Sequence, residues 1–390
     1  MPAMRRIAHP LAVVVVLPLL VLTGQALAPA GATAAPAPPT TRPAPPATRP
    51  GDRFAGQLES CRAEHKVPAL GAALFEDGRV AILAVAGTTA VDGRDRVAPD
   101  DAWHLGSDTK AMTATLAARL VEQGKIRWDT TLAEGLPELA DAMHDVHKAV
   151  TLRQLLGHRA GIIGHEANQY AMPILWQIQN EPGDRPMRAR RVEAARRILQ
   201  APPAGAPGKE FRYSNYGYVV ACAMLERAGD AAYEELMRRE VFGPLGMTSA
   251  GFGPPPRISG HVKRGQAWAP LNRDNPAVSA AAGAVHVNLA DWAKFAAAHL
   301  GRVEGYLKPE TIAFLHEPVP GEGGPAYALG WGVGRTPDGG PLLSHAGSNT
   351  MWFAVIQLDP ARKRAYLAAC NAWDEPAVNA AVALLHEHDD

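Results

Sequence analysis

The 390-residue sequence is poor in the groups on which several protein classes depend. It contains only three Cys, too few for a small disulfide-held scaffold or a four-Cys zinc site. One disulfide among Cys61, Cys222 and Cys370 is conceivable and would leave one thiol over. Lys and Arg total 39, as do Asp and Glu, so the formal net charge is zero. This balance gives no electrostatic reason to expect a nucleic acid or an anionic membrane as a partner.

Long apolar segments are also scarce. The apolar run at residues 11–22 spans only twelve residues, whereas a membrane-spanning helix needs about 20. It follows two Arg and precedes Ala-x-Ala patterns at 26–28 and 32–34, which together predict a cleavable signal peptide over residues 1–35. We therefore expect a secreted, cell-envelope or periplasmic protein with no stable membrane insertion after cleavage.

A change in composition marks where the folded part begins. Residues 36–51 are rich in Pro, Ala and Thr, which predicts an extended polyproline II linker without a core. Residues 52–390 have the mixed apolar and charged composition of a globular domain. We therefore expect a single domain after the linker.

Strand patterns occur at both ends of this domain and helical patterns occur between them. Residues 69–76 and 79–86 are joined by Asp77-Gly78, which predicts a β-hairpin. The other expected strands are 327–333, 351–358 and 364–370. The expected helices are 54–66, 107–123, 152–156, 188–200, 215–228, 231–241, 289–300 and 376–386.

This order of elements predicts an α+β fold. N- and C-terminal segments, about 52–125 and 300–390, would form an antiparallel sheet flanked by helices. A mainly helical region, about 126–299, would be inserted between them.

Serine is scarce as well. The chain contains eight, at positions 60, 107, 214, 249, 259, 279, 344 and 348, and only Ser107 is followed three positions later by Lys, at Lys110. This spacing places both side chains on one helix face. A buried, neutral Lys amine could take the Ser proton, and the backbone N–H at a helix N-terminus can stabilise an oxyanion. An N-cap Ser with an exposed Lys would show the same spacing.

A second pattern pairs a phenol with an amide. Tyr213 is the only Tyr followed two positions later by Asn, at Asn215. A phenol beside a cationic Lys ionises more easily and can move protons, and the amide can hold a substrate carbonyl or the Lys amine. A core Tyr and a helix-capping Asn are the ordinary alternative.

A third pattern, residues 345–348, lies on or beside a C-terminal strand. Gly347 permits close approach of the backbone, and the N–H of Ser348 could be a second oxyanion donor. His345 can set the charge near the phenol. Taken alone, a surface-loop His would explain this pattern equally well.

In this order, the three patterns resemble those of class C serine β-lactamases, the penicillin-recognising D,D-peptidases and family VIII esterases. The resemblance covers essentially all of residues 54–385. Further matching segments lie at 105–110, 120–126, 152–161, 242–247 and 328–332. The resemblance implies a β-lactamase/transpeptidase-like fold.

The resemblance also implies roles for individual residues. Ser107 would be the nucleophile and Lys110 its base, Tyr213 would carry the proton, and Asn215 would orient the substrate. His345 and Gly347 stand where the family has its Lys-Thr-Gly type of triplet, and the backbone N–H groups of Ser107 and Ser348 would stabilise the oxyanion.

Two departures from the family pattern affect the expected activity. His345 stands where most β-lactamases of this group have a Lys that holds a substrate carboxylate. A His at this place is similar to D,D-peptidase, D-aminopeptidase and esterase relatives. The loop 157–160 lacks the usual small hydroxyl residues, which we interpret as a change behind the site. We expect an exported, monomeric serine hydrolase that acts through an acyl-enzyme on an ester or amide carbonyl of a small molecule or short peptide. It would be an esterase or an enzyme like a D,D-carboxypeptidase or D-aminopeptidase.

This expected reaction needs no cofactor and no metal. A β-lactamase is the alternative, and a non-catalytic binder of peptidoglycan-like ligands is a further one. A metal hydrolase is another alternative because the chain has 14 His. Its densest groups, at 144–147, 165–166 and 386–388, do not match the His-Glu-x-x-His motif, so we interpret them as surface His.

Overall fold

The computed structural model of the protein describes residues 50–163 and 172–388. The predicted signal peptide, nearly all of the predicted linker and the His-Glu pair at 165–166 lie outside these residues. None of the helices in the described part is both long and apolar enough to cross a membrane.

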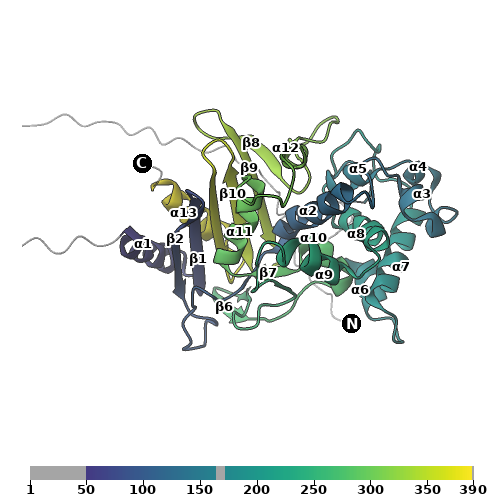
Figure 1. Ribbon diagram of the computed structural model, residues 1–390. Coiled ribbons are helices and arrows are strands. Elements are labelled where there is room, and N and C mark those ends of the chain that lie inside the picture. The colour runs from purple at the N-terminus through teal and green to yellow at the C-terminus, as the bar shows by residue number, and fades with distance from the viewer. Residues whose placement is uncertain (1–49, 164–171, 389–390) are drawn as a thin grey trace, which may run out of the picture. The chain divides into compact units, whose positions relative to one another are not determined.

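The described part is built on a six-stranded antiparallel sheet with the strand order β2-β1-β11-β10-β9-β8 (Figure 1). Its strands are β1 (Ala69–Glu76), β2 (Arg79–Gly87), β8 (Gly332–Arg335), β9 (Pro341–Ser348), β10 (Phe353–Asp359) and β11 (Arg364–Cys370). Leu70 on β1 lies opposite Cys370 on β11, so the two ends of the chain close one sheet. The predicted α+β fold is confirmed.

Helices cover both faces of this sheet. α1 (Pro50–His65) and α13 (Glu375–His386) pack on one face, and α11 (Leu289–His299) packs on the other. The remaining helices are α2 (Thr109–Glu122), α3 (Leu132–Gly135), α4 (Asp145–Lys148), α5 (Leu152–Leu156), α6 (Pro173–Gln179), α7 (Met187–Gln200), α8 (Asn215–Gly229), α9 (Tyr233–Met237), α10 (Ala280–Gly283) and α12 (Pro309–His316). Most of these lie in the inserted helical region, to the right of the sheet in Figure 1.

Short elements connect the sheet to the helical region. β3 (Trp103–His104), β7 (Val285–Val287) and β4 (Gly251–Phe252) form a small sheet, and β5 (His261–Arg264) pairs with β6 (Ala267–Pro270). Single helical turns are η1 (Gly106–Asp108), η2 (Pro137–Leu139), η4 (Arg238–Phe242) and η5 (Ala277–Ser279).

The expected strand at 327–333 is largely wrong. The strand begins only at Gly332, because Gly330 adopts a φ of +80° and the chain turns tightly, with the Ala328 N–H bonded to the Trp331 carbonyl. Ala328, Leu329 and Trp331 are fully buried. Their apolar pattern therefore reflects a buried turn and not a strand.

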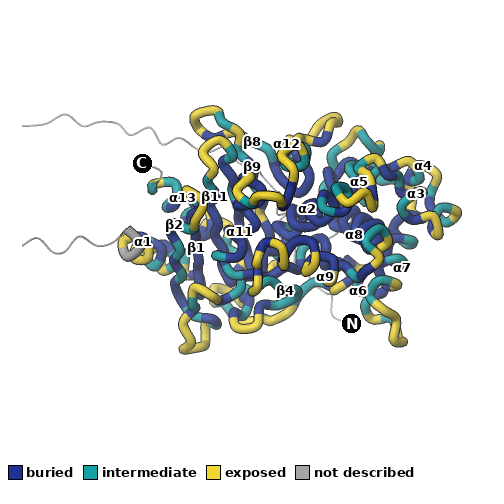
Figure 2. Tube along the Cα trace, in the orientation of Figure 1, coloured by how far each residue is buried: buried dark blue, intermediate teal, exposed yellow. Residues whose placement is uncertain are grey.

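Two apolar layers stabilise the sheet, one on each face. In Figure 2 the central strands of the sheet are accordingly coloured as buried over most of their length. On β1, Leu70 and Leu74 face α1 and contact the layer that contains Phe54, while Ala69 and Ala73 face the other layer. Full burial of a Leu or Phe side chain stabilises a fold by about 1.5–3 kcal/mol. The three Cys are buried and free, so the conceivable disulfide does not form.

A pair of buried His connects α11 to α12. His299 Nδ1 lies 2.9 Å from His316 Nε2, and His299 Nε2 lies 2.9 Å from the Thr115 hydroxyl. Burial lowers the pKa of His299 well below its ordinary value, and the charge of His316 would add to this effect. Burial, with a smaller effect from Lys363, lowers the pKa of His316 to about 4.

This pair predicts a loss of stability in mild acid. The unfolded chain binds protons on these His below about pH 6.5, whereas the folded chain does not until the pH nears 4, so stability falls over this interval. We expect His316 alone to lower the free energy of unfolding by about 1–2 kcal/mol between pH 7 and pH 5. Urea unfolding of wild type and His316→Gln at pH 7, 6 and 5 measures it. An equal pH slope in the two proteins would contradict this expectation.

Candidate active site

Ser107 lies at the junction between the sheet and the helical region. It occupies the middle of η1, directly before α2, so the predicted helix at 107–123 begins with a tight turn. Gly106 makes this turn possible because it adopts a φ of +52°. The Leu105 N–H bonds to the Val285 carbonyl on β7, which fixes the turn against the small sheet. The Ser107 side chain is thereby held half-buried at the beginning of α2.

Lys110 lies one turn along α2 and is fully buried. Its Nζ lies 2.9 Å from Ser107 Oγ, 2.9 Å from Asn215 Oδ1 and 2.7 Å from the Ala282 carbonyl oxygen. Burial lowers the pKa of Lys110 well below its ordinary value, and the nearby Asp108 opposes this shift in part. Burial likewise raises the pKa of Asp108. The alternative that the same spacing allowed, an N-cap Ser followed by an exposed Lys, is therefore wrong.

Asn215 and Tyr213 come from the start of α8. The Ser214 hydroxyl caps this helix by accepting the Gly217 N–H at 3.1 Å, so Asn215 is the first helical residue and points its amide at Lys110. The Tyr213 ring centroid lies 4.8 Å from Lys110 Nζ. The structure thus brings together the hydroxyl, the amine, the amide and the phenol that the sequence suggested.

His345 lies on β9, opposite the helical side of the site. Its Nε2 lies 3.0 Å from the Tyr327 hydroxyl, and its Nδ1 lies 2.9 Å from the Ala346 carbonyl oxygen. Because that carbonyl can only accept, we assign the proton to Nδ1. Burial, with a smaller effect from Lys110, lowers the pKa of His345 to about 3. The imidazole is therefore neutral at pH 7, and its ring lies 6.5 Å from that of Tyr213.

Two Gly allow β9 to approach the turn that carries Ser107. A Cβ on Gly347 would lie 1.9 Å from the Leu105 carbonyl oxygen and 2.6 Å from the Ser107 backbone nitrogen. A Cβ on Gly106 would lie 2.3 Å from the Ser348 backbone nitrogen. The backbone nitrogens of Ser107 and Ser348 therefore lie on adjoining segments, as an oxyanion site requires.

Sequence reasoning missed several residues of the site. His158, from the loop interpreted as a change behind the site, accepts the Ser214 N–H on its Nδ1 and packs its ring 4.2 Å from that of Tyr213. Arg159 donates to the carbonyls of Lys209 and Glu322. The departure in this loop was visible in the sequence, but its contact with the phenol was not.

Asp108 was also missed, although it lies inside the Ser-x-x-Lys pattern. Its carboxylate lies 3.3 Å from His345 Nδ1 and is fully buried. An Asp directly after a candidate nucleophile can be either buried beside the site or exposed on the helix surface. No sequence signal distinguishes the buried position from the exposed one.

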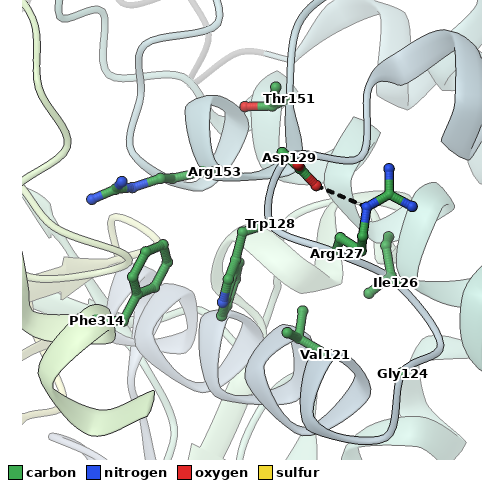
Figure 3. Close-up of a pocket in the computed structure, with 9 residues that line it drawn as sticks. All are labelled: Val121, Gly124, Ile126, Arg127, Trp128, Asp129, Thr151, Arg153 and Phe314. Atoms are coloured by element: carbon green, nitrogen blue, oxygen red, sulfur yellow. Dashed lines mark hydrogen bonds and ion pairs between the residues drawn. The ribbon is translucent and has the colours of Figure 1, made fainter. Parts of the chain in front are cut away.

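Figure 3 shows a pocket beside the C-terminal end of α2. Its volume is about 500 Å³ and it is lined by Val121, Gly124, Ile126, Arg127, Trp128, Asp129, Thr151, Arg153 and Phe314. Trp128 stacks on Phe314, with ring centroids 5.1 Å apart. None of the predicted site residues lines this pocket. In the described part of the chain, no cluster of three or more His, Cys, Asp or Glu could hold a metal ion.

The close approach of β9 predicts a severe effect of one methyl group. In Gly347→Ala, the new Cβ would overlap backbone atoms of Leu105 and Ser107, which cannot move independently of α2. We expect the rate of hydrolysis to fall at least about 100-fold and the free energy of unfolding to fall by about 1–3 kcal/mol. Rates with a p-nitrophenyl ester and thermal unfolding measure the two effects.

Gly56→Ala is the matched control. Gly56 lies in α1 with no atom near its Cβ position, so Ala there should stabilise the helix by about 0.5–1 kcal/mol and leave hydrolysis unchanged. Wild-type activity in Gly347→Ala would show that the two segments are not tightly apposed.

Comparisons with known proteins identify the family of the chain. The Beta-lactamase family model matches residues 54–388. Penicillin-binding protein 4 of Amycolatopsis lactamdurans is 28% identical over 322 residues, which are 78% of this chain and 81% of that protein. Unguisins hydrolase ungD' of Aspergillus campestris is 26% identical over 298 residues, which are 70% of this chain but only 53% of that protein.

A solved structure shows the same fold. The octameric penicillin-binding protein homologue from Pyrococcus abyssi superposes with a TM-score of 0.69 and 25% sequence identity, over 85% of this chain and 77% of that one. The family match spans nearly all of the described residues, including every residue of the predicted site. The chain therefore belongs to the Beta-lactamase family and is a serine hydrolase with the β-lactamase/transpeptidase-like fold.

Proposed function

We propose that this protein is an exported serine hydrolase that cleaves an ester or amide through an acyl-enzyme on Ser107, with Lys110 as the base. The observation that carries this proposal is the set of contacts around Lys110 Nζ. Two of its three partners, Asn215 Oδ1 and the Ala282 carbonyl, can only accept hydrogen bonds. They use both hydrogens of a neutral amine, and its lone pair is left for the Ser107 hydroxyl.

The electrostatics support the neutral form of this amine. Burial lowers the pKa of Lys110 from its ordinary value of 10.5, which moves it toward the range where a base works at neutral pH. The nearby Asp108 opposes this shift in part.

The remaining groups fit an acyl-transfer sequence. Ser107 Oγ attacks the carbonyl carbon as its proton passes to Lys110 Nζ, and the oxyanion is held by the N–H groups of Ser107 and Ser348. The proton then reaches the leaving alcohol or amine with the help of Tyr213, and the C–O or C–N bond breaks. Water attacks the acyl-enzyme in the same manner and releases the acid.

The charge at position 345 bears on the substrate. His345 is neutral, so it provides no positive charge for a substrate carboxylate at the place where most β-lactamases of this group have Lys. This favours esters and amides that carry no carboxylate near the reacting carbonyl. A β-lactamase acts on substrates that do carry one, which makes this activity less favoured.

The nucleophile can be tested with a covalent probe. A fluorophosphonate or a penicillin should form one adduct on Ser107, located by peptide mass spectrometry. Ser107→Ala should lower kcat for a p-nitrophenyl ester by at least about 10³-fold, and Lys110→Ala by about 10²–10⁴-fold, with unchanged thermal unfolding of Ser107→Ala. Binding of the penicillin without an adduct or turnover would support a non-catalytic binder instead. A fully active Lys110→Ala protein would exclude Lys110 as the base.

The substrate preference can be tested by restoring the missing charge. His345→Lys places a cation beside Asp108 and should raise kcat/KM for a D-Ala-D-Ala peptide or a cephalosporin, relative to a short p-nitrophenyl ester, by about tenfold, or roughly 1.4 kcal/mol. His345→Gln, which stays neutral, is the control and should leave this ratio unchanged. If wild type already prefers the carboxylate-bearing substrates, the proposed preference for uncharged ones is wrong.

A further inference from the structure

A second charged group lies behind the turn of Ser107. Asp274 belongs to the loop between β6 and η5, and its side chain is only 8% exposed. Its Oδ2 lies 2.9 Å from His104 Nε2, and its Oδ1 accepts the Asn349 Nδ2 amide at 2.9 Å and the Asn275 N–H at 2.7 Å. Asp274 is thus bonded to two segments that are distant from it in the sequence.

The first of these segments leads directly to Ser107. The backbone N–H of Gly106 donates to His104 Nδ1 at 3.1 Å. A backbone N–H can only donate, so Nδ1 must be the unprotonated nitrogen and the ring proton lies on Nε2, which donates it to Asp274. One carboxylate therefore fixes the tautomer of His104, and this tautomer holds Gly106 immediately before the nucleophile.

The second segment leads directly to Ser348. Asn349 is the next residue, and its Oδ1 also accepts the Met351 N–H at 3.2 Å. The Ser348 hydroxyl is occupied within the same turn, since it donates to the Trp352 carbonyl and accepts the Thr350 N–H. The Trp352 ring stacks on His104 at 5.3 Å, which gives the two segments a second contact.

The charge of Asp274 persists although the residue is buried. Burial alone would raise its pKa, but the adjacent His104 and the hydrogen bonds from His104, Asn349 and Asn275 together hold the pKa below its ordinary value. An ionised carboxylate accepts on both oxygens, whereas an amide or a protonated acid would present a donor on one side. The arrangement is complete only with the anion.

We propose that Asp274 is a positioning residue that holds the Ser107 and Ser348 backbone N–H groups at the separation an oxyanion requires. It acts through His104 and Gly106 on one side and through Asn349 on the other, and it touches neither substrate nor nucleophile. This inference rests on the proposed function, because it assigns Asp274 a part in the same reaction.

The test is the substitution Asp274→Asn, which keeps the shape and removes one acceptor. The amide hydrogens would then face either His104 Nε2–H or the Asn349 amide, so His104 must change tautomer or Asn349 must lose its partner. Removal of a whole oxyanion donor costs about 10²–10³-fold in kcat, and a displaced donor should cost less, about 10–100-fold. We expect KM for a p-nitrophenyl ester to change less than about twofold, because only the tetrahedral state is affected.

A thionoester distinguishes this role from general damage to the fold. Its sulfur is larger than oxygen and a weaker acceptor, so an intact oxyanion site favours the oxygen ester. In Asp274→Asn the ratio of ester to thionoester rates should fall, whereas a partly unfolded enzyme loses both rates equally. Asn272→Ala, an exposed residue of the same loop, is the control and should keep the wild-type rates and ratio.

Further variants keep the outcomes separate. Asn349→Ala removes the bond to Asp274 on the β9 side, together with the bond from the Met351 N–H, and leaves the His104 side intact. It should lower the same ratio, so it decides the matter if Asp274→Asn does not fold. An unchanged ester/thionoester ratio in the folded variants overturns the role of Asp274, whether or not stability falls. If Ser107→Ala retains turnover, the proposed function itself fails, which is a different result.

Discussion

The active-site geometry depends on the burial of one amine that has no carboxylate bonded to it. Lys110 is fully buried and its three nearest partners are a hydroxyl, an amide oxygen and a backbone carbonyl. A charged ammonium in such surroundings would lose most of its hydration without an ion pair to replace it. The fold therefore favours a neutral amine, and the helical region supplies two of the three groups that hold it.

Three parts of the chain must pack correctly for this amine to work. η1 carries Ser107 and α2, which follows it, carries Lys110; α8 carries Asn215, and β9 carries His345 on the opposite side. α2 and α8 are helices, and β9 is a strand of the six-stranded sheet. The reactive groups therefore lie where the helices contact the sheet. A small displacement of β9 from α2 would separate the reactive groups without unfolding the sheet or the helices. A side chain at Gly106 or Gly347 would force such a displacement, which explains why Gly is required where β9 touches the Ser107 turn.

The sequence allowed much of this arrangement to be predicted, and physical reasons explain the remainder. The hairpin, the C-terminal strands and the Ser-x-x-Lys helix have local signals, such as Asp-Gly turns and apolar spacing, that do not depend on distant residues. The segment ending in Trp331 was misassigned because a buried turn and a buried strand have equally apolar sequences. Asp274 and the Ala282 carbonyl carry no local signal, since their importance arises only when loops distant in the sequence are brought beside α2.

The pairing of the first strand with the last has a consequence for how the molecule is made. The Ala69 N–H bonds to the side chain of Asn371, 302 residues along the chain, and β1 lies between β2 and β11 in the sheet. Closing a loop of this size is entropically costly and slow. β1 cannot pair with β11 until synthesis has passed β11, so a ribosome-bound chain lacks the complete sheet, and with it a working catalyst, until that strand has emerged.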